Sequence, residues 1–225
     1  MIVVDFSGTL IDASVVEEAN LMRYSLLGLP EPTEDEHKRL HATKGHYDVI
    51  KERIAKDYGI TDDMGIDYVQ NYGDEITLSG KDVKTIMMTD LFRNAMYLVA
   101  KKHGISIFRE GMLAALQELV NRGYKLAIVS GIRTDIITGM LSITKCPIKF
   151  DQILGQDPVL SRDNSGLLGM LEEPVSHIIG DKQSDLEPAG ELGAKTIFLK
   201  GGHPTGDEKA DHVIEKPTEL LDILA

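Results

Sequence analysis

The sequence has a single cysteine and no tryptophan. Because Cys146 has no second thiol to pair with, an internal disulfide is excluded, and we expect a reducing, cytoplasmic location. Long apolar runs are missing too, since no window reaches the roughly 18 apolar residues that a membrane-spanning helix needs. The opening "MIVVD" meets a charge after four residues, which is too short for the apolar part of a signal peptide. Neither a disulfide-stapled secreted module nor a transmembrane protein is expected.

Positive charge is also scarce. The chain has 24 lysines and arginines against 36 aspartates and glutamates, a formal net charge of -12. Such a surface repels nucleic acid and anionic lipid, and no local basic patch offsets it, so we expect neither partner. What the chain does have is 42% hydrophobic residues over a length of 225. That suffices for one sizeable domain, or for a domain that carries a smaller inserted one.

The pattern along the chain divides it into three parts. The opening "IVVD" is a short β-branched run, typical of a buried parallel strand. Residues 13–103 have apolar positions at helical spacing and stops at glycine, so we predict helices throughout. From Phe108 onward strands and helices alternate, which predicts βαβ units and a parallel sheet. Since the first strand belongs to that sheet, the helical stretch is predicted to be an insertion.

Polar side chains stand where the predicted strands end. Asp5 follows "IVV", Ser130 and Gly131 close "LAIVSG", and Asp181 follows "VSHIIG", with Asp185 one helical turn later. Ligands of open parallel sheets bind at the carboxyl ends of strands, so we expect these residues to converge. Converging carboxylates need a cation, and oxygen ligands suit Mg²⁺, whose shell also accepts a substrate phosphate. The pattern therefore predicts a magnesium–phosphate site with one carboxylate free to attack.

With these residues in view, the sequence resembles the haloacid dehalogenase (HAD)-like hydrolase superfamily, mostly phosphatases and phosphotransferases. "IVVDFSGTLID" is similar to the first motif of that family, "LAIVSG" to the second and "GDKQSD" to the fourth. The resemblance implies an α/β fold with a Rossmannoid three-layer α/β/α core and a parallel sheet. It places the core in residues 1–12 and 106–225, and an α-helical cap domain in residues 13–105.

The resemblance also implies a role for each matched residue. Asp5 would be the nucleophile that accepts the phosphoryl group, and Ser130 with Gly131 would bind the phosphate. Mg²⁺ would be held by Asp5, Asp181, Asp185 and the backbone carbonyl of Ser7. The implied activity is hydrolysis of a small phosphorylated metabolite through an aspartyl phosphate on Asp5.

The first departure from the family pattern is Ser7. Phosphatases of the family usually carry an aspartate there, which protonates the leaving group and then activates water, and serine has no pKa suited to that work. We therefore expect slow or unusual turnover, a substrate with a good leaving group, or a base from elsewhere. His37, His41 and His46 of the cap are candidates by reach, although each is better interpreted as an ordinary surface side chain.

The second departure is the third motif, where the family places a cation before the fourth motif. The usual "KP" is absent. Arg162 in "LSRDNSG" is the first substitute, Lys182 is the second, and Lys145 and Lys149 are weaker. Farther along the chain, "LKGGHPTG" follows a predicted strand, and we interpret its His203 as a loop residue.

Several alternatives stay open at this point. A phosphotransferase would use the same residues, and a phosphonatase would need a cap lysine, for which Lys38, Lys44 and Lys51 are candidates. A dehalogenase needs no Mg²⁺, so the intact "GDKQSD" counts against it. A non-catalytic protein that binds a phosphorylated ligand would fit the loss of the acid at position 7. Retention of the nucleophile, Asp5, favours an enzyme.

Overall fold

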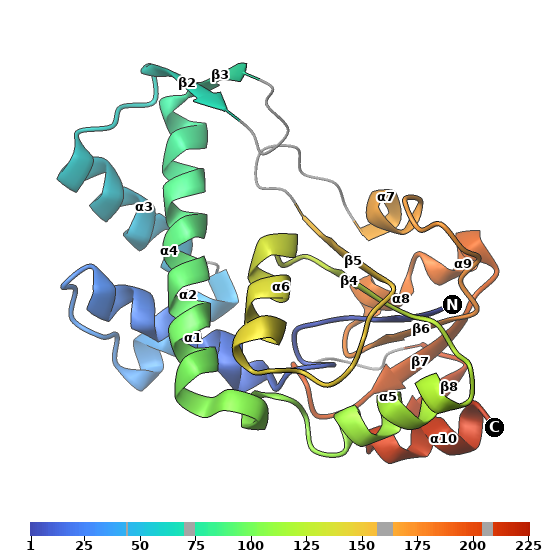
Figure 1. Ribbon diagram of the computed structural model, residues 1–225. Coiled ribbons are helices and arrows are strands. Elements are labelled where there is room, and N and C mark those ends of the chain that lie inside the picture. Colours follow the sequence, from blue (N-terminus) through green and yellow to red (C-terminus); the bar gives the residue numbers. More distant parts are fainter. Residues whose placement is uncertain (44, 70–74, 157–163, 204–208) are drawn as a thin grey trace. The chain divides into compact units, whose positions relative to one another are not determined.

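The computed structural model describes residues 1–43, 45–69, 75–156, 164–203 and 209–225 (Figure 1). The chain divides into two compact units. The core unit consists of Met1–Val16 and Met96–Ala225, and the cap unit of Glu17–Ala95. Both divisions fall inside long helices, whereas the sequence predicts boundaries at 12/13 and 105/106. In the described parts of the chain, no helix combines the length and the apolar character needed to cross a bilayer.

The core unit is built on one parallel sheet. Its order is β5-β4-β1-β6-β7-β8, and all five pairs of neighbours run parallel. The strands are β1 (Ile2–Val4), β4 (Leu126–Ser130), β5 (Gln152–Gly155), β6 (His177–Gly180), β7 (Lys195–Leu199) and β8 (His212–Ile214). The apolar "IVV" of β1 is completely buried because β1 lies in the middle, paired with β4 and β6.

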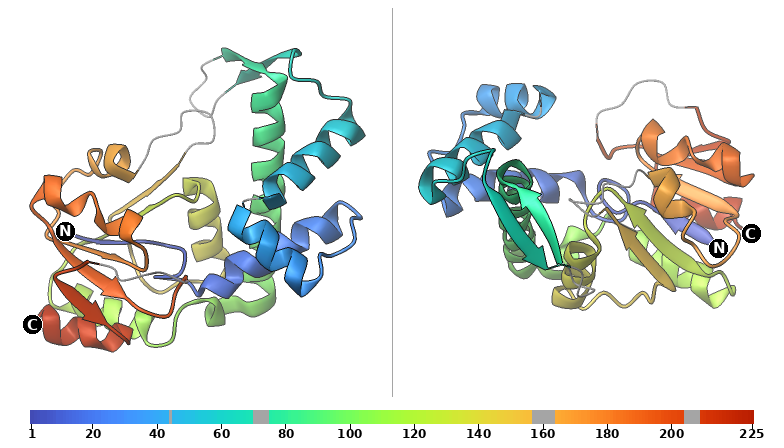
Figure 2. Two further views of the ribbon diagram at one scale, coloured as in Figure 1. Left: turned by 180° about the vertical axis from the view of Figure 1, so that it is seen from behind. Right: turned by 90° about the horizontal axis from the view of Figure 1, so that it is seen from above.

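Helices cover both faces of this sheet. Figures 1 and 2 show α5 (Met112–Asn121), α6 (Thr134–Ile143) and α10 (Leu220–Ile223) on one face. The other face carries α7 (Asn164–Leu168), α8 (Gln183–Leu186) and α9 (Ala189–Leu192). Alternate strand residues such as Val3, Val129 and Ile178 form one apolar cluster with α7, α8 and α9. The predicted α/β fold with a parallel sheet and three layers is thereby confirmed. Two short 3-10 helices, η1 (Gly104–Ile107) and η2 (Pro217–Glu219), complete the core unit.

One predicted helix of the core is interrupted. The sequence predicts a single helix over "DLEPAGELG", but α8 ends at Leu186 and α9 begins at Ala189. Pro188 stands between them, and its ring lacks the N–H that would continue the first helix.

The cap unit is mainly helical. It contains most of α1 (Ala13–Leu26) and α4 (Gly80–His103), together with α2 (Glu34–Thr43) and α3 (Gly45–Tyr58). The predicted start of α2 has a reciprocal cap, in which Thr33 N–H donates to Glu36 Oε2 at 2.9 Å and Glu36 N–H donates to Thr33 Oγ1 at 3.4 Å. Tyr24, Ile50, Ile54, Ile60 and Met88 form the centre of this unit.

The prediction of helices throughout residues 13–103 is wrong in one place. β2 (Gly65–Val69) and β3 (Glu75–Ser79) form an antiparallel pair. "EITLS" alternates apolar and polar residues, "GIDYV" does so at its centre, and both contain β-branched or aromatic side chains, which favours strands. Each run is only 5 residues long, so its alternation is too short to stand out from the helical pattern on both sides.

Candidate active site

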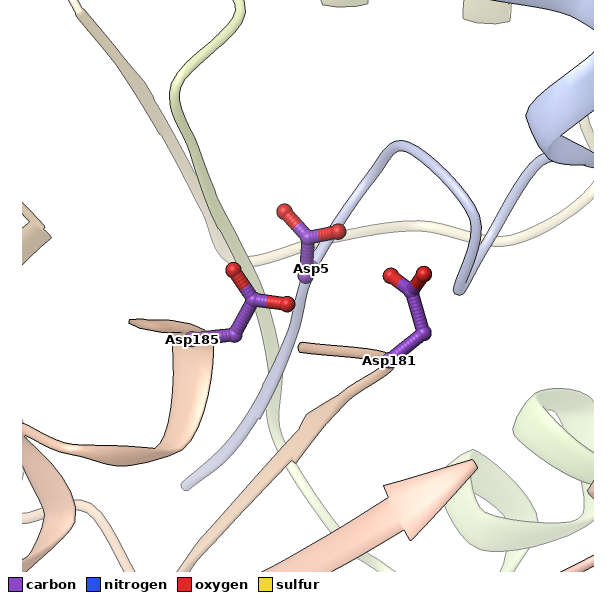
Figure 3. A group of neighbouring side chains, drawn as sticks. All are labelled: Asp5, Asp181 and Asp185. Carbon is purple, nitrogen blue, oxygen red and sulfur yellow. The ribbon is translucent and has the colours of Figure 1, made fainter. Parts of the chain in front are cut away.

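The carboxyl ends of the three central strands bring polar side chains together. Asp5 follows β1, Ser130 ends β4, and Asp181 follows β6. Asp185 comes from α8 and points toward the same place (Figure 3). One carboxylate oxygen from each of Asp5, Asp181 and Asp185 lies within 4.8 Å of the other two. Residues as far apart in sequence as 5 and 181 therefore meet because β1 is inserted between β4 and β6.

Two of the three carboxylates, those of Asp5 and Asp181, are buried, and Asp185 is partly buried. Asp5 is 7% exposed and Asp181 is 1% exposed. Burial, and then the charges of Asp185 and Asp181, raise the pKa of Asp5 well above its usual value. Burial and the charge of Asp181 likewise raise the pKa of Asp185 to about 6. The small hollow beside these groups is lined by Val3, Asp5, Val129, Leu168, Ile178 and Asp185.

This cluster fits a divalent cation. Two like charges about 4 Å apart repel by about 4 kcal/mol at an effective dielectric constant of 20. That is a large part of the roughly 5–15 kcal/mol by which a domain is stable, so three ionised carboxylates in one buried place need a counter-charge. All three offer oxygen, the donor atom that Mg²⁺ prefers. The donor set therefore suits Mg²⁺ on charge and on ligand type.

Asp5 has partners that orient it. Its carboxylate accepts hydrogen bonds from the N–H of Phe6 and from the hydroxyl of Ser130, which is 2% exposed. The Ser130 hydroxyl oxygen in turn accepts a hydrogen bond from Ile132 N–H at 3.4 Å, in the turn that contains Gly131 and precedes α6. Ser130 and Gly131 thus lie beside the nucleophile candidate, where a phosphate could be bound.

The Asp181 carboxylate has three hydrogen bonds, one with Thr9 and two with His203. Thr9 Oγ1 donates to Asp181 Oδ1 at 3.0 Å. His203 N–H lies 2.7 Å from Asp181 Oδ2, and His203 Nδ1 lies 2.8 Å from the same oxygen. A Cβ on Gly8 would lie 2.4 Å from that oxygen, and one on Gly202 would lie 2.2 Å from it. Burial acts to raise the pKa of Asp181, but the hydrogen bonds from His203 outweigh it and lower this pKa.

The sequence placed His203 in a loop, which is correct, but it missed this contact. The signal available was position, because "LKGG" continues from β7, whose carboxyl end adjoins that of β6. Arg109 was missed too. Its Nη1 donates to the carbonyl of Gly8 at 2.7 Å and its Nη2 donates to the carbonyl of Lys200. Arg109 thereby ties the loop after β1 to the loop after β7.

Comparison with known proteins decides the family. A sequence model described as "Haloacid dehalogenase-like hydrolase" matches residues 2–199, which is most of the chain. The chain belongs to this family of hydrolases. The resemblance seen in "IVVDFSGTLID", "LAIVSG" and "GDKQSD" is therefore confirmed, and the chain is an enzyme of the HAD-like class.

Individual relatives are more distant. The chain is 29% identical over 121 residues to a phosphoglycolate phosphatase of Aquifex aeolicus, covering 48% of this chain and 55% of that protein. The chain thus spans about half the length of the curated relative that it matches. Among solved structures, the HAD-hydrolase YfnB of Bacillus subtilis, bound to magnesium, superimposes with a TM-score of 0.66 at 14% identity, covering 99% of this chain and 97% of YfnB. CbbY of Rhodobacter sphaeroides, in complex with xylulose-(1,5)bisphosphate, gives a TM-score of 0.63 at 19% identity, with 97% and 95% covered. At these identities the likeness shows the fold with its cap.

The first departure from the HAD pattern, Ser7, lies in a tight turn. Gly8 N–H donates to the carbonyl of Ile11 at 2.9 Å, and Ile11 N–H donates to the carbonyl of Phe6 at 2.9 Å. Gly8 has a φ of +86°, a conformation that a side chain disfavours. The Ser7 side chain is partly buried in this turn.

The structure describes three of the four candidates for the third-motif cation. Arg162 lies outside the described residues. Lys182 is partly buried directly after Asp181, and its charge lowers the pKa of both Asp181 and Asp185. Lys145 and Lys149 are exposed between α6 and β5. This stretch precedes a strand, so both lysines lie at the amino ends of the strands, away from the carboxylates.

The cap candidates are placed as follows. His46 is 3% exposed, and its Nδ1 is 2.9 Å from the Tyr24 hydroxyl. The His37 ring centroid is 4.9 Å from that of His46. His46 is therefore buried in the cap unit rather than on the surface, contrary to the expectation. The side chains of Lys38 and His41 lie outside the part that the structure describes, as does Lys44, while Lys51 is partly buried on α3.

Proposed function

We propose that this HAD-like hydrolase is a Mg²⁺-dependent phosphatase that acts on a small phosphorylated metabolite. The observation that carries the proposal is the convergence of Asp5, Asp181 and Asp185 within 4.8 Å, with the Ser130 hydroxyl on Asp5. Phosphoryl transfer to an aspartate requires a carboxylate that lies beside a cation site and beside a hydrogen-bond donor for the phosphate, and Asp5 meets both conditions.

The residues that would hold Mg²⁺ are Asp5, Asp181, Asp185 and the carbonyl of Ser7. When bound, Mg²⁺ withdraws charge from a phosphoryl oxygen and screens it from the attacking carboxylate. YfnB, which has the same fold, was solved bound to magnesium. His203 and Thr9 orient Asp181 through hydrogen bonds to its two oxygens.

The chemical steps fall to the protein's own groups. A carboxylate oxygen of Asp5 attacks phosphorus, the bond from phosphorus to the ester oxygen breaks, and the alcohol leaves after it takes a proton from water. With substrate bound, the Ser130 hydroxyl turns from Asp5 and donates its one hydrogen to a phosphoryl oxygen, and the Lys182 ammonium offsets negative charge. Water then attacks the phosphorus of the acyl phosphate, the bond from phosphorus to the Asp5 oxygen breaks, and a proton of the attacking water passes to solvent. Inorganic phosphate is released and the carboxylate of Asp5 is restored.

Ser7 sets the expected rate. A serine hydroxyl neither protonates the leaving oxygen nor accepts the proton of the attacking water at neutral pH. The first step is therefore slow for esters of poor leaving groups. The second step is slow for every ester, so the aspartyl phosphate is long-lived. A phosphotransferase is the second candidate, because a long-lived aspartyl phosphate can pass its phosphoryl group to an alcohol instead of water.

The class of substrate is proposed from the likeness to known proteins. The Aquifex aeolicus relative is named for phosphoglycolate, and the CbbY structure contains xylulose-(1,5)bisphosphate. Both are small phosphorylated metabolites, so we propose that class.

The decisive experiment is a phosphatase assay on p-nitrophenyl phosphate and acetyl phosphate, with Mg²⁺ or with EDTA. These substrates have good leaving groups and need little acid catalysis. We expect phosphate release with Mg²⁺, none in EDTA, and none from Asp5→Asn, which should keep its fold. Release by Asp5→Asn at the rate of the unmodified protein would overturn the assignment of the nucleophile.

A second assay separates the two candidate functions. The protein is incubated with acetyl phosphate and trapped by acid at short times. A persistent aspartyl phosphate on Asp5 that is lost faster when glycerol is added indicates phosphotransfer. Phosphate that disappears at a rate independent of glycerol indicates hydrolysis.

A further inference from the structure

The cap unit buries a positive charge for which the described residues provide no opposite charge. Arg23 on α1 is 1% exposed. Its Nη2 donates to Oδ1 of Asn20, one turn earlier on the same helix. Its Nε is buried without a hydrogen-bond partner. No carboxylate of the described chain forms an ion pair with it, although buried charges in proteins are normally paired.

Two aromatic rings flank the guanidinium instead. The Arg23 Cζ atom lies 5.5 Å from the centroid of Tyr47 on α3 and 5.2 Å from that of Phe92 on α4. Such cation–π contacts offset part of the desolvation cost but do not use the N–H donors. Burial lowers the pKa of Arg23, while the neighbouring Tyr47 and Tyr24 act in the opposite direction. An arginine remains charged under such influences.

The surroundings are polar for the interior of a small helical unit. Tyr24, the neighbour of Arg23, hydrogen-bonds to His46, the neighbour of Tyr47. The pair Arg23–Tyr24 on α1 therefore faces the pair His46–Tyr47 on α3. Asn20 adds an amide group beside Arg23.

Access to this place depends on Tyr47. That residue is 48% exposed, although its ring lies over the guanidinium. Exposed side chains change rotamer within picoseconds to nanoseconds, so rotation of one half-exposed ring uncovers Arg23.

We propose that Arg23 is the anchor of an oxyanion-binding site in the cap, which takes the carboxylate or phosphate group of a small molecule. The planar guanidinium fork matches two oxygens of such a group, and the anion supplies the missing negative charge. The anion has two possible sources. It is either a second anionic group of the substrate itself or a separate small anion that regulates the enzyme. The first source rests on the proposed function, whereas binding of the anion does not.

The binding test uses malonate and inorganic phosphate in EDTA, where the acidic cluster of Asp5, Asp181 and Asp185 repels anions. We expect calorimetry to show binding of one of these anions, which also raises the unfolding temperature of the unmodified protein. Arg23→Met should weaken that binding by at least about tenfold, the effect of losing charge-assisted hydrogen bonds. The variant Arg53→Met removes a partly exposed cap arginine that is paired with Asp57, and it should bind the anion unchanged.

The unfolding temperature of Arg23→Met gives a further test, because loss of an arginine with a purely structural role would lower it. If Arg23 serves a ligand, its replacement by an apolar side chain of similar length leaves the unfolding temperature without anion equal or higher. If Arg23→Met does not fold, Arg23→Lys takes its place, because it keeps the charge and loses the fork. The proposal is overturned if neither anion binds the unmodified protein, or if either variant binds as tightly as the unmodified protein.

Turnover then distinguishes the two sources. If the anion belongs to the substrate, Arg23→Met raises KM for 2-phosphoglycolate, a phosphate ester that carries a carboxylate, but not for p-nitrophenyl phosphate. If the anion is separate, malonate changes turnover of p-nitrophenyl phosphate by the unmodified protein and not by Arg23→Met. Anion binding without turnover of either ester would contradict the proposed phosphatase and still support the site.

Discussion

At the scale of single residues, Asp181 shows how the site is prepared. Both of its carboxylate oxygens accept hydrogen bonds from the protein, Oδ1 from Thr9 and Oδ2 from His203. A ligand side chain fixed in this way keeps its direction without an ion. The hydrogen bond from the His203 ring adds to one from its backbone N–H, so the side chain and the loop contribute separately.

The contribution of the His203 ring can be measured. His203→Ala should weaken Mg²⁺ binding by about tenfold, because loss of a residue that orients a metal ligand costs about 10- to 100-fold in affinity and the backbone N–H remains. Calorimetry with Mg²⁺ gives the affinity directly, without reference to catalysis. His212→Ala, on edge strand β8, is the matched control and should bind Mg²⁺ unchanged. Equal affinities in the two variants would show that the ring does not orient Asp181.

Ser7 supports a second prediction at this scale. Ser7→Asp should increase turnover of alkyl phosphate esters by roughly 10²- to 10⁴-fold, the usual contribution of general acid–base catalysis. For p-nitrophenyl phosphate, whose leaving group needs no proton, the increase should come only from faster hydrolysis of the aspartyl phosphate, because the general base acts on that step for every ester. The comparison is made by steady-state kinetics on both esters with saturating Mg²⁺. A fall in turnover on both would mean that the serine is adapted to another reaction.

At the scale of elements, two glycine-containing loops meet around the Asp181 carboxylate. Gly8 in the loop after β1 and Gly202 in the loop after β7 leave no room for a Cβ beside Asp181 Oδ2. Arg109 joins the same two loops through the carbonyls of Gly8 and Lys200. Both loops therefore approach the Asp181 carboxylate with their backbones. A side chain on either glycine would push its loop away from that carboxylate.

Gly8→Ala tests this arrangement. Gly193 is the matched control, because it also has a positive φ, +63°, but its absent Cβ has no neighbour within 4 Å. Gly193→Ala should lower the free energy of unfolding by about 1 kcal/mol, the cost of a left-handed conformation. Gly8→Ala should lower it further and also weaken Mg²⁺ binding, as read by chemical denaturation and calorimetry. Similar effects of the two substitutions on both readouts would contradict the steric account.

Prediction from the sequence succeeded for elements whose pattern is long or bounded by clear signals. The apolar runs "IVV" of β1 and "LAIV" of β4 predicted buried parallel strands, and the end of each run identified Asp5 and Ser130. The β2–β3 pair was missed because 5-residue strands between helices give too few repeats of period two. His203 and Arg109 were missed because each reaches the site through a loop, where no periodicity indicates direction. Arg23 was missed because one arginine on an amphipathic helix is ordinarily exposed.

At the scale of the whole molecule, the acidic cluster couples cation binding to stability. Two buried carboxylates and the partly buried one of Asp185 repel one another in the ion-free protein, and a bound cation would remove that cost. Binding at 100 times the dissociation constant would add about 2.7 kcal/mol to the free energy of unfolding. We therefore expect Mg²⁺ to raise the unfolding temperature of the protein substantially.

Asp185→Asn should separate repulsion from binding. Asparagine can still accept the hydrogen bond that Lys182 N–H donates to Asp185 Oδ2 at 3.0 Å, while one negative charge is removed. In EDTA the variant should be more stable than the unmodified protein by roughly 1 kcal/mol or more. With Mg²⁺ it should gain less, as measured by thermal unfolding in both conditions. A variant that is less stable in EDTA would show that the carboxylate contributes more through packing than it costs through repulsion.

The position of β1 also decides the order in which this protein can take shape during synthesis. β1 leaves the ribosome before β4 and β6, yet its pairing residues begin at Leu126 on one side and His177 on the other. At about 5 to 20 residues per second, some tens of seconds at the slow end pass before the second partner is made. Ile2, Val3 and Val4 have no strand to pair with until β4 is made, and one side of β1 stays unpaired until β6 is made, while residues 17–95 are already synthesised. The nucleophile candidate is translated before both neighbouring strands, and it reaches its final surroundings only after the second of them is made.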